Sequence, residues 1–170
     1  MAILPILTAP DKRLKQKSLP VVAVDPSICR LMDDMLETMY AASGIGLAAP
    51  QVGVLKQVIV VDIGTELDKR VHAPLQLVNP EIVRSEGELS WKEGCLSVPE
   101  QAAEVMRSAV IEVRAMDRNN QPVHIEATEL LAVCLQHEID HLQGTLFIDH
   151  LSRLKRALIL QKLKKAREKE

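Results

Sequence analysis

The chain has 170 residues, 47% of them hydrophobic, so we expect a single domain over residues 1–170 that buries a core. Its 21 basic and 23 acidic residues give a formal net charge of −2, which argues against nucleic-acid binding by the body of the protein and predicts no specific DNA binding. Its three cysteines have no paired spacing, and we find neither a signal peptide nor an apolar run of about 18 residues, so we expect a cytoplasmic protein without a membrane partner.

The first predicted element is an amphipathic helix. Asp25 provides a capping carboxylate, Pro26 occupies the first helical position, and the pattern ends near Ser43–Gly44. Its apolar residues recur on one face: Ile28, Leu31, Met32, Met35 and Met39. We predict that this helix has a structural role.

Short stretches with strand character follow the first helix. Because Pro, Gly and Asn residues separate them, hairpins are favoured over crossover units, and the sheets should be mostly antiparallel. The stretches are Gln57–Ile63, Leu75–Val78, Glu81–Arg84, Val110–Asp117 and Pro122–Ile125.

Two further helices are predicted in the last third of the chain. The first covers Ala127–Leu142 and is closed by Gly144. The second, over residues 152–170, is basic, with eight Lys or Arg against two Glu from residue 153 onward, and we expect Leu154, Leu158 and Leu163 to face inward. The expected fold class is α+β, with antiparallel sheets around the central 127–142 helix and helices near both ends.

The central helix contains the strongest chemical signal. His137 and His141 are separated by four residues, so both imidazoles can reach one metal ion, and Glu138 lies beside them. An exposed helix with two ordinary histidines is the alternative. It is disfavoured because the histidines share a face with Leu130, Val133 and Cys134, where burial is costly unless these groups are paired or bind metal.

A catalytic site of this kind needs a third protein ligand, and two cysteines compete for the position. At roughly 1.5 Å rise per residue, Cys134 lies about 10 Å along the helix from His141, too far for one tetrahedral centre. Cys95 lies in the turn-like segment Glu93–Ser97, where Gly94 allows a close backbone approach. We prefer Cys95, with a buried structural thiol as its alternative.

A glycine-containing segment, Gly44–Gln51, follows the first helix. Its small residues suit a close approach of backbone to a ligand, and the amide of Gln51 can donate a hydrogen bond to an oxyanion. Taken alone, this segment could equally be a loop that ends a helix and starts a strand.

Together the segments Gly44–Gln51, Glu93–Ser97 and Gln136–His141 resemble the three signatures of the peptide deformylases. The resemblance implies a metal-dependent hydrolase of a linear amide, which releases formate from the N-terminal formylmethionine of nascent polypeptides. It assigns the metal to Cys95, His137 and His141. A metal-activated water attacks with Glu138 as general acid/base, while Gln51 and the backbone amide of Leu96 stabilise the oxyanion.

The resemblance also implies a metal, a substrate pocket and partners. Fe²⁺ is the expected native metal, with Zn²⁺, Ni²⁺ or Co²⁺ as replacements, because ligand type alone does not choose among them. The basic last helix implies ribosome docking, with a solvated helix face as the alternative. Trp91 and Ala102 depart from the common pattern, which leaves substrate preference open. The implied substrate-binding residues are Gly44, Ile45, Gly46, Trp91, Glu93, Gly94, Leu130, Val133 and Cys134.

Two rival functions remain at this stage. A metallopeptidase of the His-Glu-x-x-His kind would use His, Glu or Asp as its third ligand and would cut internal peptide bonds. A catalytically silent relative would bind metal without turnover, but it would have no need of Glu138 and Gln51.

Overall fold

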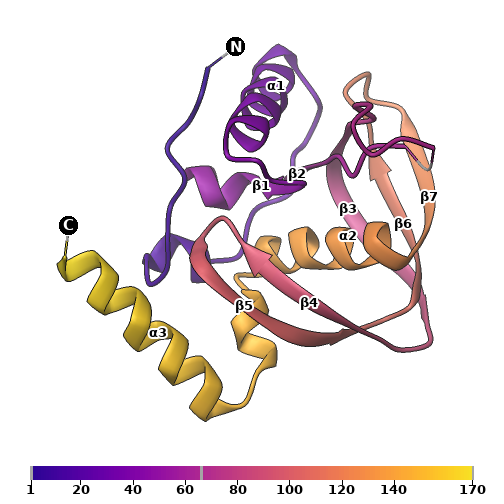
Figure 1. The fold of residues 1–170 in the computed structure, drawn as a ribbon. Helices are drawn as coiled ribbons and strands as arrows, with labels where there is room; N and C mark the ends of the chain where they lie inside the picture. Colours follow the sequence, from indigo (N-terminus) through magenta and orange to yellow (C-terminus); the bar gives the residue numbers. More distant parts are fainter. Residues whose placement is uncertain (1, 66, 170) are drawn as a thin grey trace.

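The structure is a computed structural model that describes residues 2–65 and 67–169, and it has an α+β architecture with a helix near each end of the chain (Figure 1). The main helices are α1 (Pro26–Ala41), α2 (Glu129–Leu142) and α3 (Arg153–Glu168). The strands are β1 (Gly46–Ala48), β2 (Val58–Val61), β3 (Leu75–Glu86), β4 (Leu89–Cys95), β5 (Val98–Arg107), β6 (Val110–Met116) and β7 (Pro122–Thr128). The predicted fold class is confirmed.

The strands form two separate antiparallel sheets. Five strands pair in the order β1-β2-β3-β6-β7, and β4 pairs with β5 alone. Helix α2 packs against the five-stranded sheet, and the β4–β5 hairpin lies across α2 from it (Figure 1). The hairpin also packs against α3 and the 3₁₀ turn Phe147–His150.

Strand β2 is the centre of the core. All four residues of Val58–Val61 are fully buried. Because side chains alternate along a strand, Ile59 lies in the same cluster as Leu135 of α2, while Val58 packs with Met35 of α1. The α1 helix begins at Pro26 as predicted, and its apolar face supplies this second layer of the core.

The strand predictions needed two changes. Leu75–Val78 and Glu81–Arg84 belong to one strand, β3, which is irregular at Asn79, where φ is 52°. Strands β4 and β5 were not predicted. Their exposed positions carry a mixture of charged and small residues, which hides the period-two pattern of a half-buried hairpin.

The helix predictions were wrong in two details. Strand β7 runs on to Thr128, so α2 begins at Glu129 instead of Ala127. In α3, Leu154 and Leu158 do not face inward, being 71% and 48% exposed, while Leu163 is buried as expected. Ile159, one turn before Leu163, packs against the body instead. The face of α3 that contacts β5 is therefore rotated about the helix axis from the predicted face.

Among residues 2–65 and 67–169, no helix combines the length and the apolar character that crossing a membrane requires.

Candidate metal centre and substrate pocket

The inward face of α2 presents the three polar residues of the central motif. The exposed fractions of His137, Glu138 and His141 are 8%, 4% and 1%. They are buried because α2 is covered by the five-stranded sheet on one side and by the β4–β5 hairpin on the other. Ionisable groups remain in such a position only when partners stabilise them.

The structure brings Cys95 together with both histidines. The Nε2 atoms of His137 and His141 are 3.2 Å apart, and the Sγ atom of Cys95 lies 3.5 Å from Nε2 of His141. All three potential ligand atoms lie within 4.8 Å of one another. One thiolate and two imidazoles at this separation fit the donor set of a four-coordinate metal site with an open position.

Cys134 does not join this group. Its Sγ donates to the carbonyl oxygen of Ile45 over 3.7 Å, and burial raises the pKa of the thiol well above its usual value. A thiol that stays protonated is a poor metal ligand.

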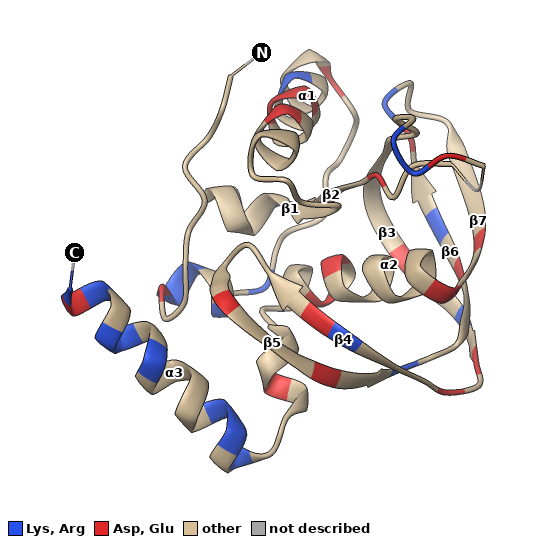
Figure 2. Cartoon of the chain, viewed as in Figure 1, with Lys and Arg blue, Asp and Glu red and all other residues tan. Residues whose placement is uncertain are grey.

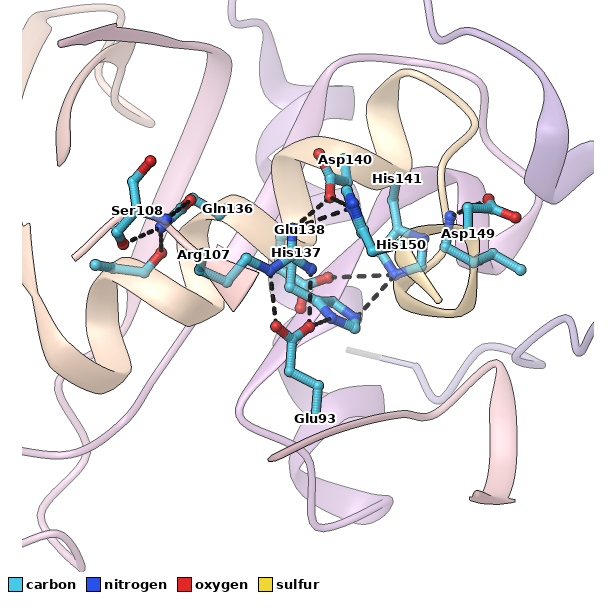
Figure 3. A network of polar contacts seen from close by, with 12 residues as sticks. Glu93, Arg107, Ser108, Gln136, His137, Glu138, Asp140, His141, Asp149 and His150 are labelled. Atoms are coloured by element: carbon cyan, nitrogen blue, oxygen red, sulfur yellow. Dashed lines mark hydrogen bonds and ion pairs between the residues drawn. The ribbon is translucent and has the colours of Figure 1, made fainter. Parts of the chain in front are cut away.

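His137 is oriented by a carboxylate. Its Nδ1 lies 2.9 Å from Oε1 of Glu93 (Figure 3). Burial would raise the pKa of Glu93, but hydrogen bonds from Arg107 and His137 outweigh it and lower the pKa. An ionised carboxylate only accepts hydrogen bonds, so Nδ1 carries a proton and Nε2 is the ring atom that lies toward His141 and Cys95, where it can bind a metal in its unprotonated form. Burial would lower the pKa of His137, but the negative charge of Glu138 and the hydrogen bonds to Cys95 and Glu93 outweigh it and raise the pKa well above its usual value.

Two buried polar atoms at this centre have no hydrogen-bond partner among residues 2–65 and 67–169. They are Oε1 of Glu138 and Nδ1 of His141. Burial raises the pKa of Glu138 to about 7 and holds the pKa of His141 well below its usual value. A neutral His141 can ligate a metal, and a carboxyl group that titrates near neutral pH is suited to proton transfer, so the residues present fit a bound divalent ion.

Gln51 is held beside Cys95. Its Oε1 accepts from the backbone N–H of Ala48 at 2.9 Å, and its Nε2 donates to Ser97 Oγ at 3.0 Å and toward Cys95 Sγ at 3.5 Å. Because the carbonyl oxygen is engaged by Ala48, the amide N–H groups face the site. Ser97 was inside the predicted Glu93–Ser97 segment, but no role was assigned to it.

A cavity of about 390 Å³ opens beside this centre. Every residue predicted to bind substrate lines the cavity, together with Gln51, Cys95, Leu96, His137 and Glu138. Among the lining residues that sequence reasoning missed are Lys92, Glu100 and Gln101 of the hairpin. Glu93 contributes to the wall, but its carboxylate is engaged by Arg107 and His137.

The two glycines of the predicted loop allow close packing around the cavity. A Cβ atom at Gly46 would lie 2.9 Å from Cys134 Sγ and would also overlap the carboxylate of Glu138. A Cβ atom at Gly44 would lie 2.8 Å from Cδ1 of Leu96, in the turn that joins β4 to β5. A larger side chain at Gly44 would therefore push the Leu96 side chain aside, and one at Gly46 would displace the Glu138 carboxylate and the Cys134 thiol.

The chain is similar to proteins of known family. A family model described as polypeptide deformylase matches residues 3–157. A peptide deformylase from Nitrosococcus oceani is 55% identical over 165 residues, covering 97% of this chain and 96% of that protein. The crystal structure of peptide deformylase from Ehrlichia chaffeensis matches with a TM-score of 0.94 and 43% identity, over 99% of this chain and 98% of that one. The structure of the Ehrlichia chaffeensis protein in complex with actinonin matches with a TM-score of 0.93 and 45% identity, over 98% of each chain.

Proposed function

The chain belongs to the polypeptide deformylase family, and on that basis we propose that Cys95, His137 and His141 hold one divalent metal ion at the end of a pocket for the methionine side chain. The protein is a metal-dependent hydrolase that removes the N-formyl group from nascent polypeptides. The convergence of three ligand atoms within 4.8 Å beside Glu138 is the observation that carries the residue assignment.

When bound, the metal supplies Lewis acidity that polarises the formyl carbonyl and acidifies a water molecule. From the family resemblance we infer that Fe²⁺ is the native ion. Zn²⁺, Ni²⁺ or Co²⁺ can replace it, since a thiolate and two imidazoles accept all four. Metal analysis of protein purified without oxygen tests this choice. A preparation that is active and contains zinc but no iron would contradict it.

Glu138 is the general acid/base of the proposed mechanism. Its buried carboxylate takes a proton from water as the water oxygen bonds to the formyl carbon, and it passes that proton to the departing amine as the C–N bond breaks. The products are formate and a peptide with a free amino terminus. The pKa of about 7 matches this role, because both protonation states of Glu138 are accessible at neutral pH.

Gln51 and the backbone amide of Leu96 stabilise the oxyanion that develops from the formyl carbonyl. Gln51 is supported by its fixed orientation, with its N–H groups directed toward Cys95 and Ser97. Leu96 lies in the turn after Cys95 and lines the same cavity. Fixed donors aimed at a developing charge stabilise a transition state without further reorganisation.

The methionine side chain enters the apolar part of the cavity. The walls here are Ile45, Leu130, Val133 and Cys134, with Trp91 of β4 at the rim. These groups are apolar or weakly polar, which matches an unbranched thioether. Gly44, Gly46 and Gly94 bring the backbone close to the substrate main chain.

Hydrolysis of three matched peptides tests the function against its rivals. Formyl-Met-Ala-Ser should be deformylated, while Met-Ala-Ser and N-acetyl-Met-Ala-Ser should remain intact. A metallopeptidase would cut all three, and a silent relative would cut none. Glu138→Ala should keep the metal and lose turnover, so wild-type activity in that variant would contradict the assigned mechanism.

The reaction takes place in the cytoplasm under this proposal, and α3 docks at the ribosome near the emerging chain. The free thiol of Cys95, which a metal ligand requires, supports a reducing compartment. Lys and Arg residues occur along the whole length of α3, where they colour the ribbon blue in Figure 2. Basic residues that are exposed in this way are attracted to the phosphates of ribosomal RNA.

A further inference from the structure

The three proposed metal ligands come from two elements that share no backbone ladder. Cys95 ends β4 of the two-stranded hairpin, while His137 and His141 lie on α2. In the part of the chain that the structure describes, no strand of the hairpin pairs with a strand of the five-stranded sheet. Apart from the backbone hydrogen bond from Ala9 N–H to the Ser97 carbonyl oxygen, side-chain contacts therefore hold Cys95 in position relative to the histidines.

Arg107, the last residue of β5, makes one of the polar connections between the hairpin and the helix, beside the His137–Glu93 contact and the two hydrogen bonds between Gln136 and the backbone of Ser108. Its Nε and Nη2 donate to the two carboxylate oxygens of Glu93 over 2.7 and 2.8 Å, and its Nη1 donates to Asp140 Oδ2 over 2.6 Å (Figure 3). Glu93 belongs to β4 and Asp140 to α2. Arg107 therefore links the strand that ends in Cys95 to the helix that carries His137.

The Arg107–Glu93 part of this connection is buried, while the Asp140 side chain is 28% exposed. The side chains of Arg107 and Glu93 are both 4% exposed, and the pairing between them is bidentate. Breaking a buried ion pair leaves an uncompensated charge, so the three groups hold one arrangement. Glu93 Oε1 also accepts the N–H of His137 Nδ1 at 2.9 Å, which places Arg107 one residue away from the imidazole.

The network reaches the protein surface at His150. Its Nε2 lies 2.9 Å from Asp140 Oδ2 and 3.3 Å from Arg107 Nη1, and its side chain is 38% exposed. His150 belongs to the 3₁₀ turn that packs against the hairpin. The turn, the helix and the hairpin are thus joined around one guanidinium group.

We propose that Arg107 is a positioning residue for the metal centre: by fixing Glu93 and Asp140 together, it sets the orientation of the His137 ring and the distance from Cys95 to α2. This inference rests on the proposed function. Its consequence is that Arg107, which touches neither substrate nor ligand atoms, controls how long the metal is retained and how it is coordinated. Loss of such an outer partner typically costs roughly 10–100-fold in metal affinity.

The test compares Arg107→Met and Arg107→Lys with the wild-type protein. Cobalt-loaded protein is mixed with an excess of chelator, and the loss of the Co²⁺ absorption bands is followed. We expect Arg107→Met to lose the metal at least 10-fold faster and to show altered bands before loss. Arg107→Lys should be intermediate, because an ammonium group keeps the charge but cannot form the bidentate pair. With formyl-Met-Ala-Ser, kcat should fall in Arg107→Met while KM changes little.

Arg84→Met is the matched control. Arg84 is a paired arginine too, bound to Glu86 and Glu112, but it lies on β3 and is 43% exposed. It should leave metal retention and the Co²⁺ spectrum unchanged. Wild-type retention and an unchanged spectrum in Arg107→Met would overturn the proposal.

If Arg107→Met does not fold, Asp140→Asn tests the same positioning role. It removes the charge on the helix side of the network and leaves Glu93 paired with Arg107. Faster metal loss in Asp140→Asn supports the proposal, and unchanged loss overturns it. Metal retention is measured without substrate, so these results do not depend on the deformylation test. If the proposed function were wrong, the wild-type protein itself would fail to deformylate formyl-Met-Ala-Ser.

Discussion

The side-chain amide of Gln51 donates to Ser97 Oγ over 3.0 Å, and both residues are buried. Gln51 follows β1 and Ser97 lies in the β4–β5 turn, so one hydrogen bond joins two of the segments that resemble family signatures. The backbone N–H of Ser97 also points toward Cys95 Sγ at 3.4 Å. Ser97 thus contacts both a proposed oxyanion donor and a proposed metal ligand.

Ser97→Ala should lower kcat for formyl-Met-Ala-Ser by roughly 10-fold, about what the loss of one buried hydrogen bond yields. The reason is that the Gln51 amide would lose the acceptor that holds one of its N–H groups in place. The metal content should stay at the wild-type level, because the Ser97 backbone N–H is retained. Ser90→Ala, at an exposed position of the same hairpin where Ser90 bonds Glu104, is the control and should keep wild-type kcat.

Gly46→Ala should reduce kcat strongly without removing the metal. The added methyl group would overlap Glu138 and lie 2.9 Å from Cys134 Sγ, so the carboxylate would have to move. Displacement of a catalytic group by even about 1 Å can cost on the order of 100-fold in rate. Gly94→Ala should have a smaller effect, since its nearest contact is the Gln101 carbonyl oxygen at 3.4 Å. Equal losses in both variants would contradict a specific clash with Glu138.

The two pocket cysteines should respond differently to substitution by serine. Cys95→Ser should lose metal, because a hydroxyl is a much weaker ligand than a thiolate. Cys134→Ser should retain it, because the Cys134 thiol bonds the carbonyl oxygen of Ile45 instead. The metal content of both purified variants is the measurement, and the reverse order would show that the third ligand was misassigned.

Local patterns predicted α1, α2 and the residues that converge on the metal centre, because helix periodicity and short motifs are properties of adjacent residues. They could not predict the role of Arg107. Its contacts Glu93, Asp140 and His150 are 14, 33 and 43 positions away from it, and nothing in the sequence near Arg107 indicates them. The buried face of α3 could not be predicted either. Leucines occur on several faces of this helix, so the sequence alone does not show which face packs against β5.

Asp62→Asn should destabilise the protein at neutral pH. Burial would raise the pKa of Asp62, but hydrogen bonds from the Tyr40 hydroxyl and from the N–H groups of Ala73 and Gly64 outweigh burial and lower the pKa. A carboxyl group with a lowered pKa stabilises the fold above its unfolded-state value of 3.8, and that contribution is lost as pH falls through the folded-state pKa.

The difference between Asp62→Asn and wild type should therefore be about 1.5–3 kcal/mol at pH 7, the usual range for hydrogen bonds to a charged group. It should narrow as the pH is lowered below 3.8. Urea unfolding of both proteins between pH 7 and pH 3 measures it. Tyr40→Phe removes one of the donors and should show a smaller loss, while a pH-independent difference would mean that Asp62 acts without its charge.

Ribosome docking by α3 is tested by charge reversal, because truncation would remove Ile159 and Leu163, which are buried against the body. Lys162→Glu with Lys165→Glu changes two exposed side chains and leaves that packing intact. Binding that depends on phosphate contacts should weaken in this variant and should fall further as salt is raised.

The control for this experiment is Lys17→Glu with Arg30→Glu, which makes the same change in net charge at exposed positions outside α3. Both variants are sedimented with ribosomes at low and moderate salt. If the helix is the docking element, only the α3 variant should remain in the supernatant, and both should deformylate free peptides at the wild-type rate. If both variants sediment less than wild type and to the same extent, overall charge, and not α3, brings the protein to the ribosome. If the α3 variant sediments like wild type, its basic residues are a solvated helix face without a docking role.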